Sequence, residues 1–582
     1  MRRESIVPVL ALTFALVIVP ARLCQAQWQV NGGPVCTAVL TQTLPMIVSD
    51  GAGGAIVTWY DGRSGNNYII IYAQRLNAAG VPQWTADGVA LCSVAGALFS
   101  DGDPGPAMVS DGAGGAIVTW SDGRSGNGDI YAQRVSAAGV PQWTADGVAL
   151  CTNPSTQYPP AIASDGAGGA IVAWADFRNS SSPNFQSDIY AQRITAAGVP
   201  QWTADGVALC TNPSYQYSPT IASDGAGGAI VTWYDQRRNF PGTDIYAQRV
   251  SAAGAPQWTA DGVALCPAAE GQVYPRIVSD GAGGAIVAWE DSRSSNPSID
   301  IYAQRVSEAG VLQWTLGGVA LCTTAANQAT IASDGAGGAI VTWQDYRSGT
   351  NYDIYAQRVD AAGAPQWTAD GVALCSAASN QGNPTIASDG AGGAVVSWQD
   401  SRSGANVPDD IYAQRVSAAG APQWTADGAA LCTVDGLQIY PTIVSDGAGG
   451  AIVTWEDTRS GVLHPSDIYA QRVNGSGGVL AVPPPSPPAS FLVLAPAPNP
   501  AQDGKLTIRF ELPSTGRVSA QILDLAGHRV RTLATDHEYS PGPQVLGWDG
   551  KNDAGVGLPS GVYFVEVREG AHSEARRAVL LR

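Results

Sequence analysis

Hydrophobic residues in this chain fall in short runs that are separated by glycine-rich turns. No stretch has a sustained helical period, so the pattern predicts strands. One segment, Ser-Asp-Gly-Ala-Gly-Gly-Ala-Ile-Val-Thr-Trp, recurs with small changes at intervals of 54 to 61 residues. Such spacing is typical of propellers and other repeat architectures. The eight copies begin at Ser49, Ser110, Ser164, Ser223, Ser279, Ser333, Ser388 and Ser445.

Each repeat is predicted to contain four strands. In the fourth copy, an apolar run at 219–223 enters the glycine turn and a strand at 229–233 follows it. A segment rich in β-forming residues at 244–250 and a fourth strand at 257–266 complete the unit. Four short strands joined by tight turns predict one antiparallel blade of a β-propeller.

The two ends of the repeat array are complementary. The last copy stops after 467–473 and lacks the Gln-Trp…Cys segment, whereas a segment of this type stands alone at 27–36. We therefore expect an all-β, eight-bladed propeller whose ring is closed by the N-terminal strand. An open stack of repeats is the alternative, and it would require polar caps at its ends.

A second all-β domain is predicted after the repeats. The repeats occupy 27–478, a proline-rich linker occupies 479–489, and the remaining residues, 490–582, show a different pattern. Proline-rich runs form stiff, extended spacers. Alternating residues at 518–524 and 562–567 predict half-buried strands of an immunoglobulin-like sandwich with about seven strands.

Both domains resemble known families. The repeats resemble bacterial β-propeller repeat proteins, and the recurring turn is weakly similar to the Asp-box of sialidase-type propellers, with different spacing. In the second domain, the ordered motifs at 496–500, 506–513, 518–533, 548–555 and 558–567 resemble the immunoglobulin-like domain of the flagellar hook cap. They equally resemble the C-terminal sorting domain of type IX secretion.

The second resemblance implies sorting or surface attachment through a secretion machinery. The arginine-rich tail at 575–582 departs from the lysine-bearing tails of sorting domains. A passive spacer domain is the alternative.

Charge and the N-terminus indicate the compartment. The formal net charge is −18 over 582 residues, which excludes nucleic acid as a partner because no basic patch neutralises phosphates. Residues 1–26 combine Arg2 and Arg3 with an apolar stretch and small residues, the pattern of a signal peptide. We expect a secreted or cell-surface protein that is monomeric. A retained membrane anchor is the alternative, and Arg22 argues against a lipoprotein cysteine at Cys24.

The residues needed for catalysis are scarce. Only four histidines occur, three of them in 490–582, and they form no cluster in the sequence. Acidic residues recur in register in every repeat, so no pair stands out for glycoside hydrolysis. We predict no enzyme activity and no cofactor. Calcium remains an alternative at the abundant Asp-Gly turns, although none matches the DxDxDG loop.

Residues that recur in every repeat are expected to be structural. One cysteine per repeat, as in Cys266, is predicted to be buried and unbridged, because equivalent positions lie one blade apart. Two tryptophans per repeat, as in Trp233 and Trp258, are expected to pack between blades; a sugar-stacking platform is the alternative. The Asp and Arg after the first tryptophan are expected to brace loops, since an active site requires differentiated residues.

The connections that differ among repeats are the candidate binding face. Loops on a rigid scaffold commonly carry binding residues, although neutral drift is an equal alternative. The candidates are Asn67, Tyr68, Phe185, Asn239, Phe240, Asn296 and His464, with Tyr158, Tyr217, Tyr274 and Tyr440 from the other connection on that side. We expect a non-enzymatic binding or adhesion module for a glycan, extracellular polymer or protein. The alternatives are a glycan-cleaving hydrolase or lyase, and a structural surface-layer component.

Overall fold

A computed structural model describes residues 28–581 except 66–68, 98–104, 181–185, 239–241, 269, 295–298, 404–408, 460–465, 480–490, 495, 497–498, 502–504, 540–541 and 571. The chain divides into two compact units, 1–480 and 481–582. The predicted signal peptide and nearly all of the predicted linker lie outside the described residues. Within the described ranges, no helix is long and apolar enough to cross a membrane.

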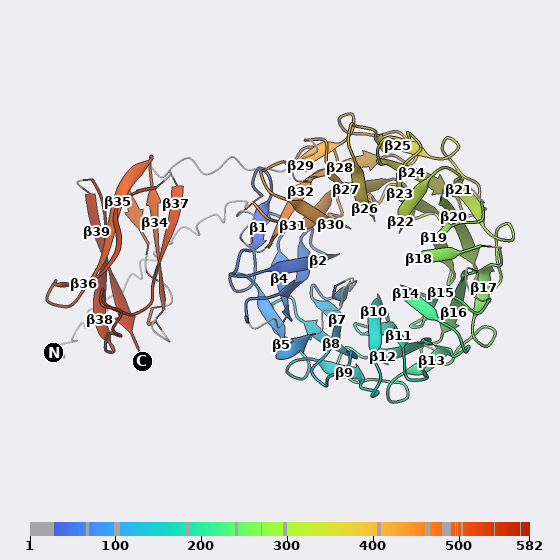
Figure 1. Ribbon diagram of the computed structural model, residues 1–582, viewed down its shortest axis with the longest axis horizontal. Coiled ribbons are helices and arrows are strands. Elements are labelled where there is room, and N and C mark those ends of the chain that lie inside the picture. Colours follow the sequence, from blue (N-terminus) through green and yellow to red (C-terminus); the bar gives the residue numbers. More distant parts are fainter. Residues whose placement is uncertain are drawn as a thin grey trace, which may run out of the picture. The chain divides into compact units, whose positions relative to one another are not determined.

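The first unit consists of repeated four-stranded antiparallel sheets, an arrangement consistent with a propeller. Figure 1 shows them in a circle, with the first strand of each sheet nearest the centre. These first strands are β2 (Gln42–Ser49), β6 (Ala107–Ser110), β10 (Gln157–Ser164), β14 (Gln216–Ser223), β18 (Gln272–Ser279), β22 (Ala326–Ser333), β26 (Gln381–Ser388) and β30 (Gln438–Ser445).

The remaining strands follow outward in sequence order, except that the last sheet takes its fourth strand, β1, from the N-terminus. The second strands are β3 (Ala55–Asp61), β7 (Ala116–Asp122), β11 (Ala170–Asp176), β15 (Ala229–Asp235), β19 (Ala285–Asp291), β23 (Ala339–Asp345), β27 (Ala394–Asp400) and β31 (Ala451–Asp457). The third are β4 (Ile69–Leu76), β8 (Asp129–Val135), β12 (Asp188–Ile194), β16 (Asp244–Val250), β20 (Asp300–Val306), β24 (Asp353–Val359), β28 (Asp410–Val416) and β32 (Asp467–Val473). The fourth are β5 (Val89–Ala97), β9 (Val148–Cys151), β13 (Val207–Cys210), β17 (Val263–Cys266), β21 (Val319–Cys322), β25 (Val372–Cys375), β29 (Ala429–Cys432) and β1 (Gly33–Cys36).

The fourth strand is shorter than the sequence predicts. In the unit predicted to pair over 257–266, β17 begins only at Val263. The preceding residues Asp261 and Gly262 have positive φ angles of 59° and 87°, which turn the chain and interrupt the pairing. Except for the nine-residue β5, the outer strand of each sheet has four residues, and it follows a tight turn of this kind.

Packing between sheets forms the core. The second strands are buried along nearly their whole length because each sheet lies between two neighbours. The tryptophan near the end of each, as in Trp233 and Trp398, is completely buried, which confirms that this series packs between sheets. Between the first and last sheets, Trp28 and Val35 join one hydrophobic cluster with Trp59 and Ile452.

The second unit has seven described strands in two sheets. One sheet contains β33 (Leu492–Val493), β34 (Leu506–Leu512) and β37 (Gly542–Trp548); the other contains β35 (Gly516–Leu523), β36 (Arg529–Tyr539), β38 (Gly561–Glu569) and β39 (His572–Leu580). Buried and partly exposed residues alternate along β35, as the sequence predicts for a strand with one core-facing side. Phe510, Ile522 and Val565 belong to the single core that this unit encloses.

Candidate functional site

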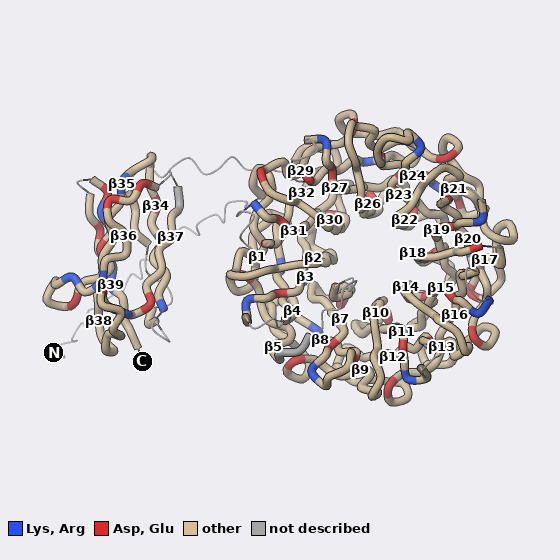
Figure 2. Tube along the Cα trace, viewed as in Figure 1, with Lys and Arg blue, Asp and Glu red and all other residues tan. Residues whose placement is uncertain are grey.

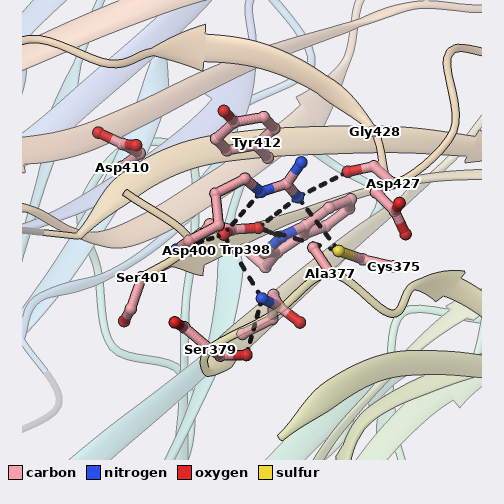
Figure 3. Close-up of polar contacts among 12 residues, drawn as sticks. Cys375, Ala377, Ser379, Trp398, Asp400, Ser401, Asp410, Tyr412, Asp427 and Gly428 are labelled. Atoms are coloured by element: carbon pink, nitrogen blue, oxygen red, sulfur yellow. Dashed lines mark hydrogen bonds and ion pairs between the residues drawn. The ribbon is translucent and has the colours of Figure 1, made fainter. Parts of the chain in front are cut away.

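The residues that recur in every repeat form a network between neighbouring sheets. Trp398 Nε1 donates to Asp400 Oδ2 at 2.8 Å, and Arg402 binds both oxygens of the same carboxylate, at 2.8 and 2.6 Å. Arg402 Nη2 also donates to the main-chain oxygen of Asp427 at 2.7 Å and lies 3.1 Å from Cys375 Sγ, on the preceding sheet. Figure 3 shows this arrangement around Asp400. It confirms the predicted bracing role of the Asp and Arg.

The cysteines of this network are structural. All eight described cysteines are buried and unbridged, as predicted. Burial raises the pKa of the Cys375 thiol to about 12, so the thiol stays protonated at neutral pH. The guanidinium of Arg402 is stacked on the Tyr412 ring, 3.8 Å from its centroid. Because the same contacts recur from sheet to sheet, they offer no differentiated site.

Most of the predicted binding residues lie outside the described part of the chain. These are Asn67, Tyr68, Phe185, Asn239, Phe240, Asn296 and His464. The four tyrosines Tyr158, Tyr217, Tyr274 and Tyr440 are described, and their expected place in connecting loops is wrong. They lie within the first strands β10, β14, β18 and β30. Each of these strands starts to pair with the second strand at a glutamine one or two residues before the tyrosine.

A β-bulge turns the first strands near their beginning. The register with the second strand shifts there in every first strand except the short β6. Tyr274 and Tyr440 sit in these bulges with φ angles of 52° and 53°, a conformation that bulky residues rarely adopt. Bulges commonly redirect a side chain at the rim of a binding site. The two residues are 51% and 48% exposed.

Both tyrosines line one pocket of about 1,050 Å³ at the centre of the circle of sheets, hereafter the axial pocket. Most of its lining residues belong to β2, β18, β22, β26 and β30, which lie around the open centre in Figure 1, and Glu290 of β19 and Glu456 of β31 also line it. Tyr158 and Tyr217 are not among the lining residues. Instead, Tyr217 stacks on Tyr215 and Tyr234, with ring centroids 5.3 and 5.8 Å apart.

Arg276 is a further lining residue, and sequence reasoning missed it. It is the one Asp, Glu, Lys or Arg within the eight first strands as described. The other sheets carry Met, Ala or Thr at the equivalent register, for example Met46 and Thr442. A comparison of the repeats at this position would have found it. Its side chain is accessible in the pocket, yet the surrounding protein lowers its pKa, an effect that Glu290 opposes.

Two buried glutamates complete the charged lining. Glu456 Oε1 accepts a hydrogen bond from Leu44 N at 2.7 Å, and Glu290 Oε1 accepts one from Gln328 N at 2.8 Å. Each carboxylate thus holds the bulge of the following sheet, as the amide of Gln399 holds that of Tyr440. Burial raises the pKa of Glu456 to about 7 and raises that of Glu290 as well.

A second depression, of about 1,080 Å³, lies on the C-terminal unit and is a weaker candidate. Its charged side chains are paired on an exposed surface, as in the ion pair of Arg517 with Asp536 at 2.8 Å. Elsewhere in the described ranges, no three His, Cys, Asp or Glu side chains are grouped to hold a metal ion. The expectations for cofactors and calcium remain predictions.

Comparison with known proteins defines the C-terminal unit. Residues 498–572 match the FlgD Ig-like domain family, in agreement with the resemblance to the flagellar hook cap. No curated protein matches the chain. The likeness to type IX sorting domains stays a prediction.

Solved structures show only remote likeness. A PL25 ulvan lyase bound to -[GlcA(1-4)Rha3S]- is 8% identical, with a TM-score of 0.42 over 78% of this chain and 96% of the lyase. The α-L-arabinanase of Penicillium chrysogenum with arabinobiose is 12% identical, with a TM-score of 0.29 over 51% and 88%. A protein of unknown function from Dyadobacter fermentans is 11% identical, with a TM-score of 0.35 over 77% and 98%. Likeness at this level defines no activity for this chain.

Proposed function

We propose that this protein is an exported, non-enzymatic binding module that holds an extracellular glycan or polymer in the axial pocket of an eight-bladed β-propeller. The observation that carries the proposal is the contrast between sheets. The Trp-Asp-Arg-Cys network is repeated around the circle, whereas the first strands differ. Arg276 occurs in one sheet, and the position that is tyrosine in Tyr274 and Tyr440 holds other residues in other sheets, as in Leu44 and Asn383. These differing residues line one pocket. Aromatic faces and a few placed polar groups in such a pocket suit sugar rings.

Closure of the propeller by its N-terminal strand is part of the proposal. Strand β1 pairs with β32 in the last sheet. Trp28 Nε1 donates to Ala78 O at 3.0 Å, the same contact that joins Trp84 to Ala137 between the next two sheets. A closed ring leaves no exposed sheet edge and fixes the geometry of the axial pocket.

We also propose that the C-terminal domain serves to display the propeller outside the cell. The FlgD Ig-like match supports a module that attaches the propeller to export or surface machinery. Deleting residues 490–582 is expected to abolish surface display or secretion while leaving ligand binding unchanged. Display that persists at its normal level would contradict this role.

A glycan panel tests binding. The full chain should bind at least one glycan class, and the double change Tyr274→Ala with Tyr440→Ala should remove that binding. Tyr346→Ala is the control, because Tyr346 is 38% exposed but does not line the pocket. Binding that survives the double change would contradict the assignment of the site.

Glycan cleavage is a second candidate that one observation favours. Glu456 lines the same pocket, and its pKa of about 7 suits a general acid or base at neutral pH. Against it, the side chain is 4% exposed and is engaged with Leu44 N. Turnover of a bound glycan that Glu456→Gln abolishes would replace the non-enzymatic proposal.

A further inference from the structure

The axial pocket contains one cation that the fold does not use. Arg276 Nη1 donates to the main-chain oxygen of its own neighbour Pro275 at 3.2 Å, and among the described residues this is its single hydrogen bond. Arginines elsewhere in the unit differ: Arg402, for example, is held by Asp400 at 2.6 Å. An arginine presents five N–H donors, so most of those on Arg276 remain available to a ligand.

The pocket's acidic residues do not neutralise this cation by direct contact. Glu290 and Glu456 are 6% and 4% exposed, and both carboxylates accept main-chain N–H groups. Neither forms an ion pair with Arg276 within the described ranges. The charge that a ligand meets in the pocket is therefore the guanidinium, even though the chain as a whole is acidic. Figure 2 shows acidic and basic positions interspersed around the circle rather than separated into opposite sectors.

The groups around Arg276 fit a sugar ring. Tyr274 lies two residues away on the same strand, and its ring packs edge-to-face with that of Tyr234, with centroids 6.3 Å apart. Tyr440 presents a second half-exposed ring in the same pocket. The side-chain amides of Gln328 and Asn383 also line the pocket. Gln328 Oε1 accepts from Asn383 N at 2.9 Å and Asn383 Nδ2 donates to Gln399 Oε1, so Gln328 Nε2 and Asn383 Oδ1 are the atoms that can bind hydroxyl groups.

We propose that the axial pocket binds an acidic oligosaccharide, with a carboxylate or sulfate on Arg276 and sugar rings against Tyr274 and Tyr440. A planar guanidinium pairs with a carboxylate or sulfate through two parallel hydrogen bonds, which gives orientation as well as affinity. This inference rests on the proposed function, that the pocket binds a glycan. It adds that the acidic group is required.

The test compares each acidic glycan with its neutral counterpart. Calorimetry on the full chain would use uronate oligosaccharides of several linkages, the methyl ester of each, sulfated oligosaccharides with their desulfated forms, and inorganic sulfate alone. We expect an acidic form to bind about 10- to 100-fold more tightly than its neutral partner, as charge-assisted hydrogen bonds provide. Equal binding of the two forms, or equally tight binding of sulfate alone, would overturn the inference but not the proposed function. Failure of every glycan would overturn the proposed function itself.

Variants of Arg276 complete the test. Arg276→Thr installs the residue that Thr330 and Thr442 provide at equivalent positions, so the fold is expected to tolerate it. It should remove the preference for the acidic form while leaving the neutral form's affinity unchanged. Arg238→Thr is the matched control, since Arg238 is exposed but does not line the pocket. A preference that persists in Arg276→Thr would contradict the proposal.

Discussion

Arg63 Nη2 lies 3.0 Å from Cys36 Sγ. The two residues belong to different sheets: Cys36 ends β1, which pairs with β32 of the last sheet, and Arg63 follows β3 of the first. The same contact joins Arg402 to Cys375 at 3.1 Å in the middle of the array. The N-terminal segment thus makes the contacts of a fourth strand, although it is separated from the rest of its sheet by the length of the repeat array.

If the N-terminal segment closes the ring, Trp28 and its counterpart Trp84 should contribute equally to the stability of the first unit. We expect Trp28→Ala and Trp84→Ala each to lower the free energy of unfolding of the first unit by about 3–5 kcal/mol, through loss of buried area and the cavity that remains. Denaturant unfolding monitored by tryptophan fluorescence measures both. A much smaller effect for Trp28→Ala would show that the junction is not equivalent to the others.

The carboxylate of Asp400, at the centre of the repeated network, should contribute more to the free energy of unfolding than the side chain of Asp427. Asp400→Asn leaves Arg402, whose side chain is 21% exposed, without its ion pair, and should cost about 3 kcal/mol. Asp427→Asn is the control, because its side chain accepts one main-chain N–H and asparagine tolerates its positive φ of 58°. The network has no bracing role if the two variants unfold at the same denaturant concentration.

The cysteines should be unreactive in the folded protein. Burial raises the pKa of Cys36 and Cys151 to about 12, and thiolate formation is required for attack on a disulfide reagent. We expect no thiol release with a chromogenic disulfide at pH 8 until denaturant is added. Rapid labelling of any of the eight in native conditions would place that cysteine outside the core.

Stability should depend on pH through Glu456. Its pKa is raised from an ordinary 4.5 to about 7, so between these values the folded protein keeps a proton that the unfolded chain releases. The free energy of unfolding therefore falls as pH rises through this range, by about 3 kcal/mol more in the natural protein than in Glu456→Gln. Gln399 fills the equivalent place in its own sheet, which makes glutamine a conservative change. If the free energy of unfolding depends on pH identically in the natural protein and in Glu456→Gln, Glu456 does not have this role.

The repeated parts of the structure could be predicted from the sequence, and the site could not. Trp398, Asp400 and Cys375 recur in register, so their burial and their bracing role follow from counting copies. The axial pocket depends on bulges that change the direction of single residues, and nothing in the local sequence specifies the positive φ of Tyr440. It also has Arg276 and Tyr440 in one lining, although these residues are distant in the chain and belong to different sheets.

The most direct test of the account is a crystal structure of the full chain with a bound oligosaccharide selected by the glycan panel. The account predicts sugar rings in the axial pocket against Tyr274 and Tyr440, with an acidic group at Arg276. A ligand that contacts Tyr68 or Phe240 instead would contradict it. An axial pocket without sugar in crystals of a complex that is saturated in solution would contradict it equally.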